Sequence, residues 1–264
     1  MNALTALLSP AAVRLDVDAG DWRAAIRAAG QALVDDGIST ADYTAEMLAN
    51  VEENGPYIVI APGLAFAHAR PSPAVLRTGL SWVRLARPVP FGHEANDPVG
   101  LVVALAATDS AAHTDAMAAL ARVLADPATG AALERARTPE EVLGILGGER
   151  PATAETDTRA DTGTAPGAAS QHKILTVCGN GVGTSLFLKN TLEQVLDHWG
   201  WSRHVTVEAT DTISAKGKAS EAVAILTSRE IARTLGDVGV PVKVVQDFTS
   251  TAEVDAVLRD TYSV

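Results

Sequence analysis

A stretch near the middle of the chain limits the possible fold more than any other feature of the sequence. Residues 147–172 read GGERPATAETDTRADTGTAPGAASQH, which is rich in Gly, Pro, Ala, Thr and charged residues and has no apolar periodicity. This composition is typical of a flexible linker. Because 264 residues are enough for two ordinary domains, we expect one domain at 1–146 and a second at 173–264.

Composition and charge argue against several classes of protein. The apolar content of 47% supports real cores, and the net charge of −11 argues against a nucleic-acid partner. A single cysteine cannot form an internal disulfide, which fits a reducing compartment. Residues 1–13 lack the basic start of a signal peptide, and the longest run of apolar residues and glycine, at 99–107, is too short to cross a bilayer. We therefore expect a cytoplasmic protein that does not insert into the membrane.

Helices and strands alternate along both predicted domains, which indicates the α/β class. In the first domain we expect helices at 21–36, 40–54, 113–125, 127–137 and from 139 onward, with strands at 57–61, 80–86 and 99–106. In the second domain we expect strands at 173–177, 204–209, 222–226 and 242–246, with helices at 185–199, 228–236 and 251–261. This alternation predicts a parallel sheet for the second domain.

The only cysteine, Cys178, follows an apolar strand and precedes a glycine-rich loop and a helix. Glycine tolerates positive φ, so backbone N–H groups of such a loop can turn inward at the helix N-terminus and bind a phosphate-sized anion. The same donors would hold the sulfur as a thiolate. The alternative is a small buried core residue. The predicted phosphate-binding residues are Gly179, Asn180, Gly181, Val182, Gly183, Thr184 and Ser185.

Two related phosphate loops do not fit this segment. A Walker loop requires Gly-Lys followed by Ser or Thr, and no lysine lies between 178 and 188. A low-molecular-weight tyrosine phosphatase has an arginine where this chain has Thr184. Without a guanidinium to clamp the phosphate, the loop is better suited to carrying a phosphoryl group than to hydrolysing its ester.

Three histidines of the first domain are candidates for chemistry. His68 follows a strand and a Pro62-Gly63 pair, in a predicted loop that also carries Arg70. A partly neutral imidazole is a good phosphoryl acceptor, and Arg70 would neutralise the incoming charge. His113 is predicted to open a helix, where free N–H groups would meet a phosphate. His93 lies in a polar loop and is interpreted as a structural residue. A metal site made by the three histidines with Asp109 or Asp115 is an alternative, but no short ligand spacing supports it.

These residues match a known family. The first domain resembles the IIA components of the bacterial phosphoenolpyruvate-dependent sugar phosphotransferase system, of the mannitol/fructose-like superfamily, through residues 55–63, 67–71 and 96–99 and His113. The phrase at 55–63, Gly-Pro-Tyr-Ile-Val-Ile-Ala-Pro-Gly, is especially similar to the ascorbate IIA. The second domain resembles the IIB components of the ascorbate and galactitol type through residues 177–185 and 188–189.

The resemblance implies a mixed sheet with flanking helices for the IIA-type domain and a small parallel, Rossmann-like sheet for the IIB-type domain. It implies that His68 is a phosphohistidine, that His113 assists and that Cys178 is a phosphocysteine. The implied partners are the phosphocarrier HPr and a separate membrane IIC permease that holds the sugar, with no cofactor, so the chain would associate with the membrane only peripherally. Two alternatives stay open: a regulatory protein that uses the same phosphorylated residues, and a cysteine phosphatase.

Overall fold

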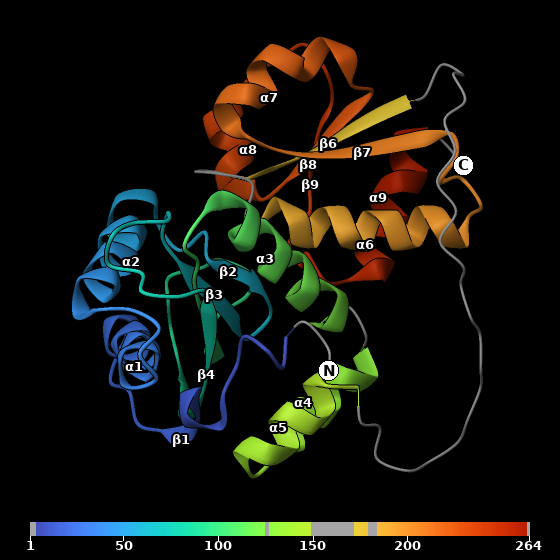
Figure 1. Ribbon diagram of the computed structural model, residues 1–264. Coiled ribbons are helices and arrows are strands. Elements are labelled where there is room, and N and C mark those ends of the chain that lie inside the picture. Colours follow the sequence, from blue (N-terminus) through green and yellow to red (C-terminus); the bar gives the residue numbers. More distant parts are fainter. Residues whose placement is uncertain (1–3, 125–126, 149–171, 179–183, 263–264) are drawn as a thin grey trace.

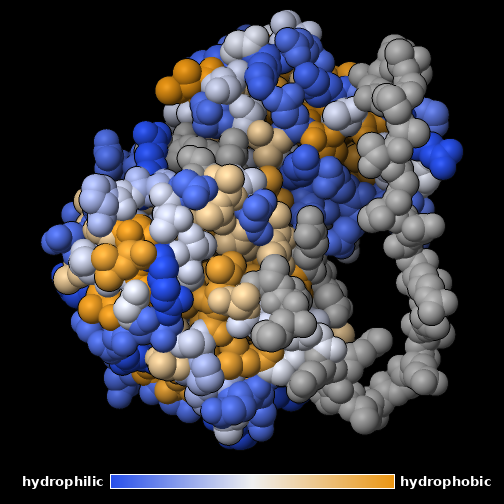
Figure 2. Space-filling view, in the orientation of Figure 1, coloured by the Kyte–Doolittle hydropathy of each residue, from blue (hydrophilic) through white to orange (hydrophobic). Residues whose placement is uncertain are grey.

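The computed structural model describes residues 4–124, 127–148, 172–178 and 184–262, and it forms two halves that pack against each other (Figure 1). Each half holds one β-sheet with helices on both of its faces. Hydrophilic residues cover most of the outer surface visible in Figure 2, while apolar residues show through near the middle of the N-terminal half.

The N-terminal half is built on a mixed sheet of five strands in the order β1-β4-β5-β3-β2. Strands β1 and β4 are parallel, as are β3 and β5, whereas β4 and β5 and the pair β2 and β3 are antiparallel. The mixed sheet confirms the expected fold of this half. The elements in chain order are η1 (Pro10–Ala12), β1 (Val13–Val17), α1 (Trp22–Asp35), α2 (Ala41–Asn54), β2 (Val59–Ala61), β3 (Leu64–His68), β4 (Gly79–Val89), β5 (Val99–Ala106), α3 (Ser110–Leu124), α4 (Pro127–Arg135) and α5 (Pro139–Leu146).

Alternate residues of the central strands enter two different cores, because successive side chains of a strand point to opposite faces of the sheet. In β5, Val102 and Ala104 face α1 and α2, whereas Val103 and Leu105 belong to the core on the other face. Trp82 of β4 is 2% exposed in this second core and is among its largest side chains. Both faces of β5 are therefore buried, which explains its continuous run of apolar residues and glycine.

The C-terminal half is a parallel sheet of four strands in the order β7-β6-β8-β9, as predicted. Helices α6 and α9 cover one face, and α7 and α8 lie on the other (Figure 1). The elements are β6 (His172–Cys178), α6 (Ser185–His198), β7 (Val205–Asp211), α7 (Thr212–Lys218), η2 (Ala219–Glu221), β8 (Ala224–Thr227), α8 (Arg229–Leu235), β9 (Val242–Val244) and α9 (Thr251–Tyr262).

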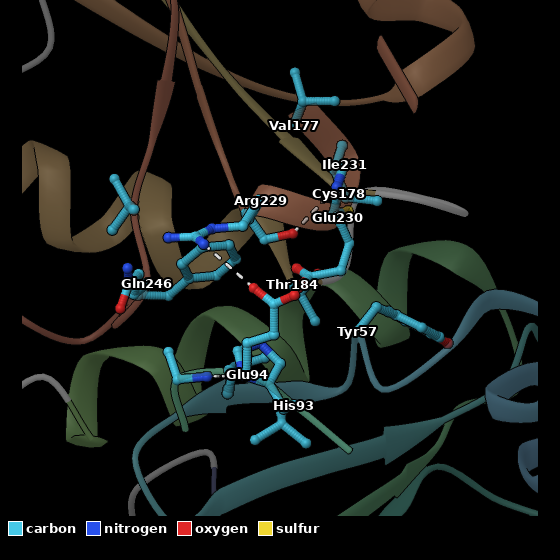
Figure 3. A pocket seen from close by; sticks show the side chains of 16 residues that line it. Tyr57, His93, Glu94, Val177, Cys178, Thr184, Arg229, Glu230, Ile231 and Gln246 are labelled. Atoms are coloured by element: carbon cyan, nitrogen blue, oxygen red, sulfur yellow. Dashed lines mark hydrogen bonds and ion pairs between the residues drawn. The ribbon is translucent and has the colours of Figure 1, made fainter. Parts of the chain in front are cut away.

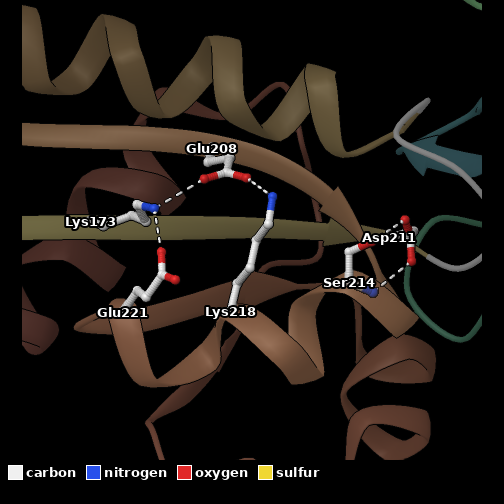
Figure 4. Close-up of polar contacts among 6 residues, drawn as sticks. All are labelled: Lys173, Glu208, Asp211, Ser214, Lys218 and Glu221. Carbon is white, nitrogen blue, oxygen red and sulfur yellow. Dashed lines mark hydrogen bonds and ion pairs between the residues drawn. The ribbon is translucent and has the colours of Figure 1, made fainter.

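Polar contacts fix α7 and η2 against this sheet (Figure 4). Lys173 of β6 lies between two carboxylates, 3.2 Å from Glu208 and 2.8 Å from Glu221, and Lys218 also pairs with Glu208. At the carboxyl end of β7, the Asp211 carboxylate accepts from the backbone N–H groups of residues 213 and 214 and so caps α7. The capped helix begins directly where strand β7 ends.

The two halves meet along α3 and α6, which pack side by side (Figure 1). Phe66 of β3 and Phe187 of α6 form an edge-to-face pair with ring centroids 5.4 Å apart, and one apolar cluster runs through both halves. Asn96 donates its side-chain amide to the carbonyl oxygen of Gln246 at 2.9 Å. The backbone N–H of Phe248 donates to the carbonyl oxygen of Ile60 at 3.1 Å. The interface therefore combines apolar packing with specific hydrogen bonds.

The structure corrects several elements expected from the sequence. Strand β3 occupies 64–68, where a loop was predicted, and β1 and α7 were not predicted at all. Helix α3 begins at Ser110, three residues before the predicted start. Thr40 directly precedes α2, and its side chain makes no cap hydrogen bond. The Thr138 side chain accepts from the backbone N–H of Glu141 and so caps α5.

Candidate functional site

His68 is the last residue of β3 rather than part of a loop, and it shares the sheet face of Leu64 and Phe66. Its Nδ1 lies 2.9 Å from the carbonyl oxygen of Phe66. Because a carbonyl oxygen only accepts, Nδ1 carries the proton and Nε2 keeps its lone pair. The side chain is buried, and burial lowers its pKa, so the ring is neutral near pH 7. A neutral imidazole with a free Nε2 lone pair is suited to accept a phosphoryl group.

His113 on α3 lies beside His68, with ring centroids 5.4 Å apart. Burial, together with the charge of His68, lowers the pKa of His113 to about 4. Its Nδ1 is buried and has no hydrogen-bond partner within the part of the chain that the structure describes. A buried polar atom without a partner costs free energy, so this nitrogen is available to a group that enters the site.

The backbone of His113 does not offer the free N–H group that was predicted. Since α3 begins at Ser110, the His113 N–H already donates to the carbonyl oxygen of Asp109 at 3.0 Å. The Asp109 carboxylate accepts from the N–H of Ala112 at 2.9 Å and so occupies the start of the helix. The imidazole ring, not the backbone of His113, is what faces His68.

Cys178 is the last residue of β6 and lies at the N-terminus of α6, as the sequence predicts. Its Sγ is 3.4 Å from Oγ of Ser185, the first residue of α6. Thr184 and Ser185 are both buried next to it. The other predicted phosphate-binding residues, Gly179, Asn180, Gly181, Val182 and Gly183, lie outside the described residues.

The thiolate was predicted from donors of the loop at 179–183, which lies outside the described residues, and the described surroundings of the thiol act in the opposite direction. Burial raises the pKa of Cys178, and it outweighs the hydrogen bonds from Ser185 and Thr184, which favour the thiolate. The side chain, at the end of β6, is only 5% exposed. The sequence identified the hydrogen-bond donors but not the burial.

A cavity of about 310 Å³ lies between the two halves, and Cys178 is part of its wall (Figure 3). Across the cavity, Glu94 accepts from Arg229 at 3.2 Å and lies 3.6 Å from Arg233, so an ion pair links the two halves. The lining residues are Tyr57, Val59, Ile60, His93, Glu94 and Ala95 from the N-terminal half, and Val177, Cys178, Thr184, Ser228, Arg229, Glu230, Ile231, Val245, Gln246 and Phe248 from the C-terminal half.

Tyr57 connects the histidine site to the cysteine site. Its ring packs edge-to-face against His68 with centroids 6.0 Å apart, and it also lines the cavity on which Cys178 lies. Burial, and in second place the charge of Cys178, raise the pKa of the Tyr57 phenol. The structure therefore brings His68, His113 and Cys178 into one region.

His93 is fixed by its own turn, in agreement with the structural role predicted for it. Its Nδ1 accepts from the backbone N–H groups of Ala95 at 3.3 Å and Asn96 at 3.1 Å. The Asp97 carboxylate accepts from three backbone N–H groups of the same turn, at residues 91 to 93. Among the described residues, no three His, Cys, Asp or Glu side chains are grouped as a metal site requires.

Arg70 follows His68 by two residues and is exposed. The structure adds Tyr57, Glu94 and Arg229 to the region, none of which the sequence singled out for chemistry. Glu94 and Arg229 are 135 positions apart in the chain, and neither carries a local signal that could have paired them. Tyr57 does lie within the quoted phrase at 55–63, which was the available signal.

Two neutral imidazoles beside each other, and a thiol at a strand end on the far side of Tyr57, are the groups that a phosphoryl-transfer protein with two sites requires. Residues 6–148 match the family described as "Phosphoenolpyruvate-dependent sugar phosphotransferase system, EIIA 2". Residues 173–260 match "PTS system, Lactose/Cellobiose specific IIB subunit". The chain belongs to the EIIA 2 family of the phosphotransferase system and is a fused EIIA–EIIB phosphotransferase.

Relatives of the N-terminal half carry a more specific description. The chain is 37% identical over 135 residues to the "Ascorbate-specific PTS system EIIA component" of Salmonella typhimurium, which covers 51% of this chain and 88% of the relative. It is 34% identical over 147 residues to the protein of the same name from Escherichia coli K12, covering 55% and 96%. The solution structure of the mannitol-specific cryptic enzyme IIA CmtB from E. coli has a TM-score of 0.50 at 29% identity, covering 54% of this chain and 97% of that one.

None of the helices in the described ranges is long and apolar enough to span a membrane.

Proposed function

We propose that the chain relays a phosphoryl group from HPr to His68, from His68 to Cys178, and from Cys178 to a sugar held by a separate membrane permease. L-ascorbate or a related acid or polyol is the proposed sugar, because the relatives of the N-terminal half carry the ascorbate description. Residues 1–146 act as the donor domain and 173–264 as the acceptor domain, with 147–172 as a flexible linker and the cytoplasm as the compartment.

The observation that carries this proposal is the placement of the two nucleophiles. His68 ends β3 and Cys178 ends β6, and Tyr57 contacts the first and shares a cavity with the second. The packing of Phe66 on Phe187, each close in sequence to one of the sites, supports a docked arrangement suited to direct transfer. Such docking replaces a bimolecular encounter by a step within one chain.

The residues suggest how each transfer proceeds. Nε2 of His68 takes the phosphoryl group through its free lone pair while Nδ1–H stays bonded to the Phe66 carbonyl. Neutral His113, whose Nδ1 has no partner among the described residues, hydrogen-bonds a phosphoryl oxygen on His68 and assists without carrying the phosphate. Sγ of Cys178 then attacks phosphorus as the N–P bond breaks, next to Thr184 and Ser185.

Labelling with radioactive phosphoenolpyruvate, enzyme I and HPr tests the relay. The wild type should carry phosphate on His68 and Cys178, Cys178→Ser on His68 alone, and His68→Ala on neither residue. Replacement of exposed His204 by alanine is the matched control and should leave both labels in place. Normal labelling of Cys178 in the His68→Ala protein, with no other IIA present, would exclude this relay.

The sugar is tested separately with membrane vesicles that contain a single permease. An ascorbate-type permease with the wild-type chain should yield phosphorylated ascorbate, and Cys178→Ser should abolish the product. Transfer to galactitol with a galactitol permease, and none to ascorbate, would reassign the substrate while leaving the relay intact.

A further inference from the structure

Tyr57 lies between the two sites and has a hydrogen-bond donor that the fold leaves unused. Asn50 donates its side-chain amide to the Tyr57 hydroxyl at 2.5 Å and to the carbonyl oxygen of His68 at 3.3 Å. The phenol oxygen is thus held as an acceptor, and its own O–H has no acceptor among the residues that the structure describes. A fixed hydroxyl with a free O–H next to a reaction site is available to donate to an incoming oxygen.

The surroundings keep this donor protonated and in place. The ring is partly buried, packs edge-to-face on His68 at an interplanar angle of 82°, and lines the interdomain cavity (Figure 3). Burial and the charge of Cys178 raise the phenol pKa above its usual value, so the hydroxyl is not ionised near pH 7.

A phosphoryl group in transit brings negative charge into a region that already holds carboxylates. Glu94 and Glu230 line the cavity, and Arg229 is paired with Glu94. A neutral donor can stabilise the phosphoryl oxygens without disturbing that ion pair. The position of Tyr57, against His68 on one side and on the cavity of Cys178 on the other, suits it to contact the group throughout its passage.

We propose that Tyr57 is a catalytic residue that donates its phenolic O–H to a phosphoryl oxygen while the group passes from His68 to Cys178; this inference rests on the proposed function. In this step the bond between phosphorus and Nε2 of His68 breaks and a bond between phosphorus and Sγ of Cys178 forms. The bonding pair returns to Nε2, which takes the proton released by the thiol. Tyr57 keeps its own proton, so all atoms and charges balance.

The test measures the two transfers separately in the full chain. The variant Tyr57→Phe removes the hydroxyl and keeps the ring that packs on His68. Loading of His68 from phosphorylated HPr is measured in a Cys178→Ser background, and passage from His68 to Cys178 is measured by rapid quench with Cys178 present. The remote Tyr262→Phe is the control, because it makes the same chemical change at a tyrosine that stacks on His172.

Tyr57→Phe should load His68 within twofold of the wild-type rate and slow passage to Cys178 roughly 10- to 100-fold, the range for loss of one hydrogen bond to a charged group. Tyr262→Phe should change neither rate. Unchanged passage in Tyr57→Phe would overturn this inference and leave the proposed relay intact. Failure of wild-type His68 to label would instead reject the proposed function, and this inference with it.

Discussion

Replacing His113 by glutamine should make the folded protein less sensitive to acid. An ordinary histidine has a pKa of 6.5, whereas the pKa of His113 in the fold is about 4, chiefly because burial disfavours the imidazolium. The unfolded chain therefore binds the proton more tightly than the folded protein does between these two values. Stability is fully present above pH 6.5 and is lost as the pH falls toward 4.

The size of the effect follows from the shift. At pH 5 the solution is about 1.5 pH units below the pKa of the histidine in the unfolded chain, so that histidine is protonated, while His113 in the fold is still neutral. This difference in proton binding lowers the free energy of unfolding by about 2 kcal/mol. Glutamine fills similar space and does not titrate, so the variant should lose about 2 kcal/mol less than the wild type between pH 8 and pH 5.

Urea unfolding at the two pH values measures this difference directly, with exposed His204→Gln as the control. The control should lose stability as the wild type does. Equal losses in the wild type and His113→Gln would show that this histidine is not held neutral by burial, and the role assigned to its unpartnered Nδ1 would lose its basis.

Three further outcomes are expected. Gly30→Ala should destabilise the N-terminal half by about 1–3 kcal/mol, because the added Cβ would clash with Oγ1 of Thr44 on α2. Gly130→Ala on α4, where a Cβ meets no atom, should stabilise the protein by roughly 0.5–1 kcal/mol. Thermal unfolding that ranks the two variants in the opposite order would contradict this packing. Glu94→Gln should let the two halves separate at lower salt than in the wild type, as a larger radius of gyration in X-ray scattering, while Glu193→Gln, which breaks an ion pair within α6, should not. Iodoacetamide should alkylate Cys178 with a pH midpoint above the ordinary 9.0, and a midpoint below that value would mean that the donors outweigh burial.

More of the helices and strands could be predicted from the sequence in the C-terminal half than in the N-terminal half, for physical reasons. Strands β6 to β8 are largely apolar runs, and α6, α8 and α9 follow strands at a regular spacing, so the local pattern predicts them, although it missed the short helix α7. Strand β3 was predicted as a loop because its five residues include two alanines, which have low strand propensity, and follow a Pro-Gly turn. It is a strand because β2 and β5 pair with it along both of its edges, which is a tertiary effect.

Some features of the candidate site could likewise be predicted from the sequence, and others could not. His68 and Cys178 are recognisable because each residue type follows an apolar strand in a chemically suggestive segment, and the structure puts each at a strand end. The raised pKa of Cys178 was not predictable, since it depends on how far the folded chain buries the thiol. The ion pair between Glu94 and Arg229 was equally hidden, because only docking of the two halves brings these residues together.

The burial of Cys178 has a consequence for the order of events in the proposed relay. At 5% exposure on the wall of the cavity between the halves, its sulfur is placed to receive a phosphoryl group from the docked domain. We expect the onward transfer to a sugar in a permease to need a second, open arrangement in which the sulfur is more exposed. The ion pair that links the halves is exposed, with side chains at 49% and 56%, and such pairs contribute only about 0–1 kcal/mol. This ion pair therefore adds little to the apolar packing between the halves, and after any separation the predicted linker at 147–172 would bring them together again at high effective concentration.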